Sequence, residues 1–168
     1  HRHYRRQRQM CIRDSPASAS RQVLGVGRSE LVEKMAHVLV GLGTECALVL
    51  HSRDGLCEVS NSSATDLAVC RDGEVTRMTW TPETFGEEVS GRSAIEVESP
   101  EQSADFIMRV LQGEQGPARS IIVLNAAAAI WLNMPEMTEK QAADAARSAI
   151  DSKAALEKLE QLSSLSQS

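Results

Sequence analysis

Apolar residues near the start of the chain first follow strand-like spacing and then helix-like spacing. A short β-branched run at residues 21–26 is typical of a strand. Ser29 and Glu30 next indicate a helix N-terminus, because serine caps helices and an acid complements their dipole. Six apolar residues then recur along one helical face: Leu31, Val32, Met35, Val38, Leu39 and Leu42. Since residues 47–50 are continuously apolar, as in a buried parallel strand, residues 21–50 are predicted to form a β-α-β unit.

The middle of the chain has the pattern of a hairpin followed by a loop. Two strand-like runs within residues 65–80 flank Asp72-Gly73, a pair that favours a two-residue hairpin turn. Residues 81–93 are polar and contain two glycines, as expected for a loop. We therefore expect a hairpin at residues 65–80 and no regular element directly after it.

The second half of the chain has the pattern of helices. Ser99 with Gln102, and Thr138 with Gln141, have the spacing of capping boxes, which mark two helix starts. Residues 118–132 are apolar on nearly all sides, and their length and alanine content favour a buried helix over a strand. A last helix is expected near the end of the chain, with three leucines docked toward the core: Leu156, Leu159 and Leu162.

The order of these elements indicates an α/β fold with a mainly parallel sheet flanked by helices. A length of 168 residues is that of one domain. Its predicted boundaries are residues 16–164, with residues 165–168 as a frayed tail. Residues 1–15 lack any apolar periodicity and are predicted to be a non-native or disordered basic segment. The string MCIRDS within them resembles translated adapter sequence, and an arm that binds nucleic acid or anionic lipid is the functional alternative.

The charge distribution argues against a nucleic-acid-binding surface. The chain has a formal net charge of −5, but residues 1–15 hold five arginines and one aspartate. The remaining 13 basic and 22 acidic side chains give a net charge of −9, which repels phosphate backbones. Aromatic residues make up 3% of the chain, so few rings are available to stack on bases. No apolar run approaches the ~20 residues of a membrane span, so no membrane partner is expected.

The cysteine pattern favours reduced thiols over a zinc site or disulfides. The chain has four cysteines: Cys11, Cys46, Cys57 and Cys70. None forms a Cys-x-x-Cys pair, and no histidine has zinc-finger spacing. We therefore expect a cytoplasmic protein with free thiols.

The region with the strongest indication of function is residues 51–60, directly after the buried strand at 47–50. In open α/β sheets, ligands bind at the carboxyl ends of the strands. Within this region, Asp54 is interpreted as a turn former and His51 as a weaker site candidate. Asn125, which is polar inside an apolar helix, is expected to bond a partner within the fold.

Five segments, taken in order, resemble the anthranilate phosphoribosyltransferase family. They are PASASRQVLGV (16–26), ELVEKMAHVL (30–39), ALVLHSRDGLCEVS (47–60), GPARSIIVLNAAAAIWL (116–132) and AIDSKAALEKLEQL (149–162). No single motif is decisive, but the ordered set is specific. The resemblance spans residues 16–164 and implies a partial α/β domain of the nucleoside phosphorylase/phosphoribosyltransferase type. In the last segment, Lys153 stands where the family has glycine.

The resemblance implies a Mg²⁺-dependent pentosyltransferase of tryptophan biosynthesis. Such an enzyme transfers phosphoribose from phosphoribosyl pyrophosphate (PRPP) to anthranilate, and Mg²⁺ neutralises the departing pyrophosphate. The family holds Mg²⁺ with an Asp-Glu pair after a Gly-Leu turn. In this chain Glu58 matches the second carboxylate and Cys57 stands in place of the Asp, with Asp54 as an alternative oxygen donor. A thiol is a poor ligand for Mg²⁺, so the resemblance assigns the metal to Glu58 and, less well, to Cys57.

Two family segments do not occur in the chain, namely the pyrophosphate loop Gly-Thr-Gly-Gly-Asp and the segment Lys-His-Gly-Asn-Arg. In the family both precede the part that this chain resembles, as does the amino-terminal helical domain. The resemblance therefore implies a fragment that is inactive by itself and belongs to a homodimer at full length. Two alternatives stay open: a pyrimidine nucleoside phosphorylase-like enzyme fragment, and a non-catalytic binding relative of the fold.

Overall fold

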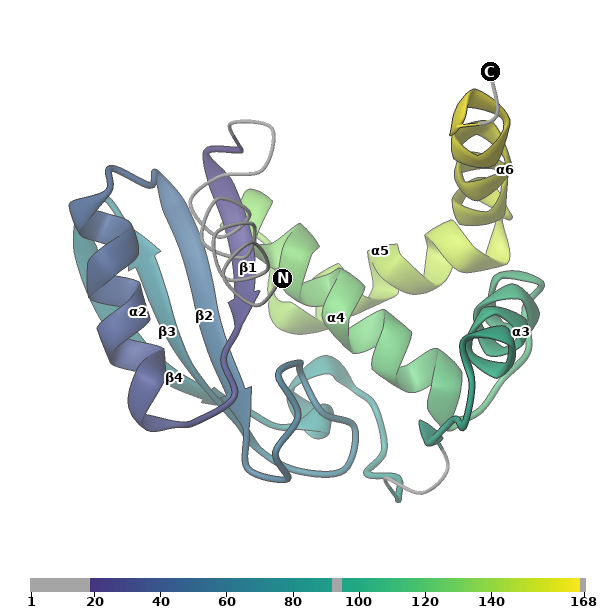
Figure 1. Cartoon of the computed structure of the whole chain (residues 1–168), viewed down its shortest axis with the longest axis horizontal. Coiled ribbons are helices and arrows are strands. Elements are labelled where there is room, and N and C mark those ends of the chain that lie inside the picture. The colour runs from purple at the N-terminus through teal and green to yellow at the C-terminus, as the bar shows by residue number, and fades with distance from the viewer. Residues whose placement is uncertain (1–18, 92–94, 167–168) are drawn as a thin grey trace, which may run out of the picture.

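The computed structural model describes residues 19–91 and 95–166 of the chain. In this part, a four-stranded sheet has one helix on its first face and a group of helices on its second (Figure 1). The expected basic segment, residues 1–15, lies outside the described residues, as do the last two residues of the expected tail.

The elements of the described residues confirm most of the expected order. They are β1 (Arg21–Gly25), α2 (Glu30–Gly41), β2 (Cys46–Ser52), β3 (Thr65–Arg71), β4 (Glu74–Trp80), the 3₁₀ helix η2 (Pro82–Phe85), α3 (Pro100–Leu111), α4 (Pro117–Asn133), α5 (Glu139–Asp151) and α6 (Ala154–Ser166). The β-α-β unit, the hairpin and the buried alanine-rich helix are all present. The segment expected to be a plain loop contains η2, whose Thr81 and Thr84 form a capping box.

The sheet is mixed, because one of the three strand pairs in the described residues is parallel. The pair β1–β2 is parallel, whereas β2–β3 and β3–β4 are antiparallel. The α/β class is confirmed, but the expected mainly parallel sheet is corrected to this mixed one. Both antiparallel pairs follow from connections without the helical crossover that parallel neighbours need. The β2–β3 connection is closed by a bond from the Arg53 N–H to the Ala64 carbonyl at 2.9 Å, and Asp72 and Gly73 both have positive φ, as a type I′ turn requires.

Alternate strand residues face two separate hydrophobic clusters. The cluster beneath α2 includes Ala47, Val49, Ala68 and Cys70. The cluster beneath α4 and α5 includes Leu48, Leu50, Leu67, Trp80 and Phe85. Strand β2 is therefore covered on both faces, which explains its continuous apolar run.

The predicted helix starts differ in how far the side chains cap them. At α5, Thr138 and Gln141 make both reciprocal bonds of a capping box, as predicted. At α3, the Ser99 hydroxyl accepts the Gln102 N–H at 3.2 Å, but the Gln102 side chain accepts from the residue before Ser99. Ser29 makes no capping bond with its side chain at α2, because its own backbone is already helical. The prediction that the Ser29 side chain caps this helix was therefore wrong.

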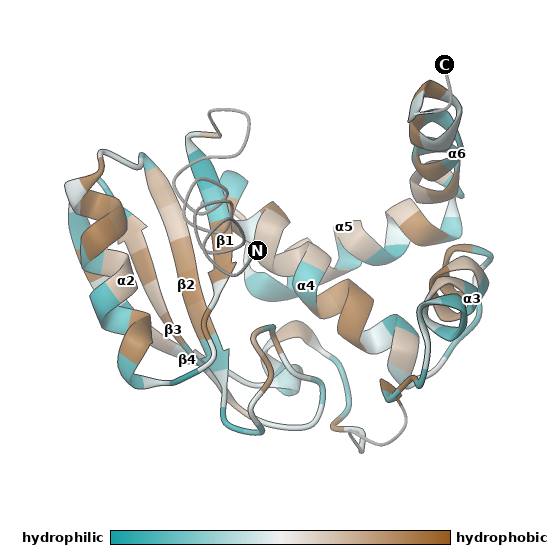
Figure 2. Ribbon diagram, in the orientation of Figure 1, coloured by the Kyte–Doolittle hydropathy of each residue, from teal (hydrophilic) through white to brown (hydrophobic). Residues whose placement is uncertain are grey.

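Helix α6 does not dock its leucines inward, contrary to expectation. None of its described side chains is buried: Leu156 is half-buried, Leu159 is 37% exposed and Leu162 is 64% exposed. Figures 1 and 2 show α6 projecting beyond α5, away from the sheet, with apolar residues along it. The periodicity predicted the helix but not the neighbour that would cover it. In the described part of the chain, no helix is both long and apolar enough to cross a membrane.

Candidate functional site

The β2–β3 loop, residues 53–64, contains both residues predicted to hold a metal. It follows the carboxyl end of β2, at the edge of the sheet where β1 also ends (Figure 1). This is the edge at which ligands of α/β proteins bind. The fold therefore places the sequence-predicted region where function is expected.

Asp54 organises the loop from within. Its Oδ2 accepts hydrogen bonds from the hydroxyls of Ser60 and Ser62, at 2.6 and 2.5 Å, and its Oδ1 accepts the Leu56 N–H at 3.3 Å. Burial by itself would raise the pKa of Asp54, but the hydrogen bonds from three serines and the Leu56 N–H outweigh burial and lower the pKa to about 2. Asp54 is therefore ionised at neutral pH, and its role as a turn former is confirmed. Because both oxygens are engaged within the loop, Asp54 is a poor substitute for the missing family carboxylate.

Helix α4 anchors the loop from outside through two amide interactions. The Asn125 Oδ1 accepts the Val59 N–H at 2.9 Å, and the Asn125 Nδ2 donates to the Val59 carbonyl at 3.0 Å. Asn61, which is fully buried in the loop, donates to the Pro117 carbonyl at 3.0 Å. The expectation that Asn125 bonds a partner within the fold is confirmed.

The backbone of Cys57 lies against the end of β1. A Cβ at Gly25 would come within 1.8 Å of the Cys57 carbonyl oxygen, so glycine is needed for this close approach. His51 adds a second link to the end of β1, since its Nδ1 lies 2.9 Å from the Val26 carbonyl oxygen. Cys57 and Glu58 are themselves exposed, so their side chains are accessible to solvent beside this tight packing.

The described residues supply an incomplete set of donors for Mg²⁺. No group of three or more His, Cys, Asp or Glu side chains among them is arranged to hold a metal ion. Glu58 offers a hard carboxylate oxygen, and Mg²⁺ is commonly bound by one or two carboxylates with substrate oxygens and water. The soft thiol of Cys57 does not suit this ion. Glu58 therefore fits a magnesium site that a substrate completes, and the assignment of either residue stays a prediction.

Sequence reasoning identified the loop but missed the contacts that shape it. Asn125 and Val59 lie 66 positions apart in the chain, so no local pattern indicates their pairing. The polar run at residues 60–63 was a usable signal, because serine and asparagine side chains at turns bond nearby backbone and carboxylate groups. The approach of Cys57 to Gly25 likewise depends on how the loop folds back onto β1.

The fold and the sequence together define the class of protein. Residues 14–156 match the family described as the glycosyl transferase family, a/b domain, and the chain belongs to this family. Two relatives with the particular activity expected from the sequence are the anthranilate phosphoribosyltransferases of Methylobacillus flagellatus and Thioalkalivibrio sulfidiphilus. The first is 42% identical over 153 residues, which cover 91% of this chain and 45% of the relative. The second is 44% identical over 154 residues, which cover 92% and 46%.

Solved structures agree with this placement. The anthranilate phosphoribosyltransferase of Thermus thermophilus superposes with a TM-score of 0.73 at 28% identity, over 82% of this chain and 40% of that protein. The Saccharomyces cerevisiae enzyme in complex with PRPP and Mg gives a TM-score of 0.76 at 25% identity, over 83% and 41%. The chain thus spans less than half the length of these relatives. The resemblance found in the sequence is confirmed, and nothing in these similarities supports the alternative of a pyrimidine nucleoside phosphorylase-like enzyme.

Proposed function

We propose that this chain forms the carboxyl-side part of the α/β domain of an anthranilate phosphoribosyltransferase. The reaction would transfer phosphoribose from PRPP to anthranilate and release pyrophosphate. The observation that supports this most directly is the identity of 42% over 153 residues with the Methylobacillus flagellatus enzyme. The position of the exposed Glu58 at the carboxyl edge of the sheet agrees with it.

Within this function, Glu58 has the role of metal ligand. Bound Mg²⁺ supplies charge neutralisation at the departing pyrophosphate. Glu58 would bind the ion through its carboxylate, while Asp54 and α4 hold the β2–β3 loop that carries Glu58. The side chain of Cys57 has no oxygen donor, so Glu58, the substrate and water would supply the metal contacts.

The surroundings of the full-length protein belong to the same proposal. A cytoplasmic location agrees with the free thiols of Cys46, Cys57 and Cys70. The acidic body favours small-molecule substrates over nucleic acid, and no membrane partner is invoked. Assembly into a homodimer rests on the family resemblance alone.

The test uses a chimaeric protein, called the joined enzyme below. In it, this chain replaces the matching region of the Methylobacillus flagellatus enzyme and follows that enzyme's own upstream half. We expect anthranilate-dependent release of pyrophosphate from the joined enzyme and none from the 168-residue chain by itself. Groups that position and stabilise the departing pyrophosphate supply much of the rate enhancement of phosphoribosyl transfer. The glycine-rich loop that does this in the family does not occur in this sequence. A folded joined enzyme without this activity would contradict the proposal, as would activity of the chain alone.

Glu58→Gln in the joined enzyme tests the metal ligand. We expect the turnover to fall about 100-fold, since a metal contact at a leaving group is worth several kcal/mol. The melting temperature should stay within a few degrees, because the Glu58 side chain is exposed. Glu88→Gln is the matched control, since Glu88 is an exposed acid on a different loop. Equal losses in both variants would exclude Glu58 as the ligand.

Cys57→Asp tests the position that departs from the family. Replacing the thiol by a carboxylate is expected to lower the Mg²⁺ concentration that gives half-maximal rate by several-fold, because Mg²⁺ prefers oxygen donors. The measurement is a Mg²⁺ titration of the initial rate, with the melting temperature of each variant beside it. If Cys57→Asp destabilises the fold and leaves the Mg²⁺ dependence unchanged, residue 57 is a packing position rather than a ligand position.

A further inference from the structure

Asn125 is a polar residue in the middle of the most apolar helix of the described chain. Helix α4 buries Val123, Leu124, Ala127 and Ala128 around it. Asn125 is itself half-buried, and a carboxamide partly removed from water is destabilising unless it has hydrogen-bond partners. Its Nδ2 also donates to the Ile121 carbonyl one turn earlier, at 2.9 Å, which fixes the rotation of the amide.

The amide of Asn125 meets the backbone of Val59 as a second peptide group would. The Val59 N–H donates to the Asn125 Oδ1 at 2.9 Å, and the Asn125 Nδ2 donates to the Val59 carbonyl at 3.0 Å. The Val59 side chain is 1% exposed and packs in the core under α4. Val59 is therefore held by its N–H, its carbonyl and its side chain at once.

The residues on either side of Val59 have contrasting environments. Ser60 is buried and donates to Asp54 at 2.6 Å, which ties the following residue into the loop. Glu58, the preceding residue, is exposed. With Val59 and Ser60 both held, the bonds to Val59 restrain the backbone from which the Glu58 side chain projects.

We propose that Asn125 is the positioning residue for Glu58. Through its two bonds to Val59, α4 sets the geometry in which the neighbouring carboxylate meets Mg²⁺. Asn125 does not touch metal or substrate and acts through the backbone of the loop. This inference rests on the proposed function, because it requires Glu58 to be the metal ligand.

The first experiment measures amide hydrogen exchange in the 168-residue chain. In Asn125→Ala, the exchange of the Val59 N–H should accelerate at least about tenfold relative to the amides of β2 and β3, which corresponds to about 1.4 kcal/mol of local opening. Asn133→Ala is the matched control. Asn133 lies on the same helix and also bonds a carbonyl one turn earlier, at 2.9 Å, but has no bond to the loop. Unchanged relative exchange at Val59 in Asn125→Ala would overturn the inference.

The second experiment titrates the joined enzyme with Mg²⁺. In Asn125→Ala, we expect the half-saturating Mg²⁺ concentration to rise about tenfold, with the KM for anthranilate within about twofold of wild type. Asn125→Asp keeps an acceptor for the Val59 N–H and loses the donor to its carbonyl, so it should recover part of the Mg²⁺ affinity. If Asn125→Ala does not fold, Asn125→Asp tests the positioning role in its place.

The outcomes separate the inference from the function on which it rests. If Glu58→Gln shifts the Mg²⁺ dependence and neither Asn125 variant does, the positioning role is wrong and the metal ligand stands. If Glu58→Gln leaves the Mg²⁺ dependence unchanged, the proposed ligand is wrong and the positioning role falls with it. A rise in the KM for anthranilate as large as the change for Mg²⁺ would show general damage to the site and would also overturn the inference.

Discussion

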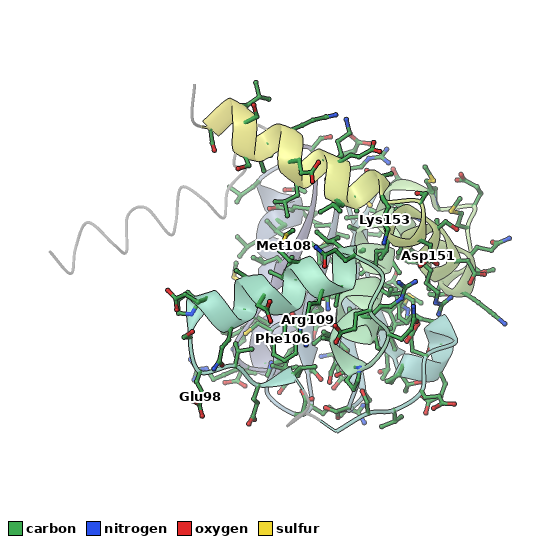
Figure 3. The ribbon with its side chains drawn as sticks, turned by 90° about the vertical axis from the view of Figure 1, so that its right-hand side faces the viewer. Glu98, Phe106, Met108, Arg109, Asp151 and Lys153 are labelled. Carbon is green, nitrogen blue, oxygen red and sulfur yellow. The ribbon has the colours of Figure 1, made fainter. Side chains whose placement is uncertain are left out.

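Lys153 adopts a backbone conformation that suits glycine, and replacing it tests how α5 ends. It directly follows Ser152, the C-cap of α5, and has a φ of 66° in the left-handed region. Helices often have glycine at this position, because a Cβ crowds the backbone there. Figure 3 shows Lys153 at the junction of α5 and α6, beside α3. Its ammonium donates to the Gln112 carbonyl at the end of α3.

Two opposing effects set the expected difference in stability between the glycine and alanine variants of Lys153. A Cβ in the left-handed region costs about 1–2 kcal/mol, whereas glycine loses about 0.5–1 kcal/mol more chain entropy than alanine on folding. Lys153→Gly should therefore be more stable than Lys153→Ala by about 1 kcal/mol. Both variants lose the hydrogen bond to Gln112, which contributes about 1 kcal/mol. Lys153→Gly is thus expected near wild type, with Lys153→Ala below both.

The assay is urea unfolding of the 168-residue chain, supported by thermal melts. The two variants should differ by about 2–4 °C in Tm, as a change of 1 kcal/mol does for a domain of this size. Lys158 in α6 is the control position, because it lies inside a helix. There the alanine variant should be more stable to unfolding than the glycine variant by about 1 kcal/mol. If alanine is as stable as glycine at position 153, the left-handed backbone carries no strain and the reasoning is refuted.

Two further predictions concern the β2–β3 loop. Gly25→Ala should destabilise the chain by about 1–3 kcal/mol in urea unfolding, because the new Cβ meets the Cys57 carbonyl, whereas Gly27→Ala, with nothing within 4 Å, should be near neutral. The pKa of Asp54 lies at about 2, below its ordinary value of 3.8, so the stabilisation it provides above about pH 4 is lost as the pH falls toward 2. Asp54→Asn should remove that part of the acid sensitivity, at most about 2 kcal/mol between pH 5 and pH 2, and an unchanged pH profile would contradict it.

The sequence by itself determined the local elements and the class of fold. The β-α-β unit, the hairpin at Asp72-Gly73 and the start of α5 at Thr138 were predictable, because each depends on residues a few positions apart. Apolar periodicity selects strand or helix, and turn and cap chemistry sets where they end. The same local signal placed Glu58 on a loop after a buried strand, and the ordered segments indicated the family to which residues 14–156 belong.

The sequence pattern could not predict a feature where several tertiary arrangements fit the same pattern equally well. The apolar run of β2 was read as a sign of a mainly parallel sheet, but burial on both faces arises equally in this mixed sheet. The leucines of α6 have helical spacing whether or not a neighbour covers them, and in this chain Leu162 is mostly exposed. The left-handed backbone at Lys153 was visible only as the loss of a family glycine.

The tertiary structure alone decided how the candidate site is held. The bonds from Asn125 to Val59 and the approach of Cys57 to Gly25 join residues that are far apart in the chain. Such contacts exist only after sheet and helices have packed, since the packing of α4 and β1 against the same loop determines which groups meet. The sequence therefore identifies Glu58 as the candidate ligand, while the fold determines the shape of the loop that carries it.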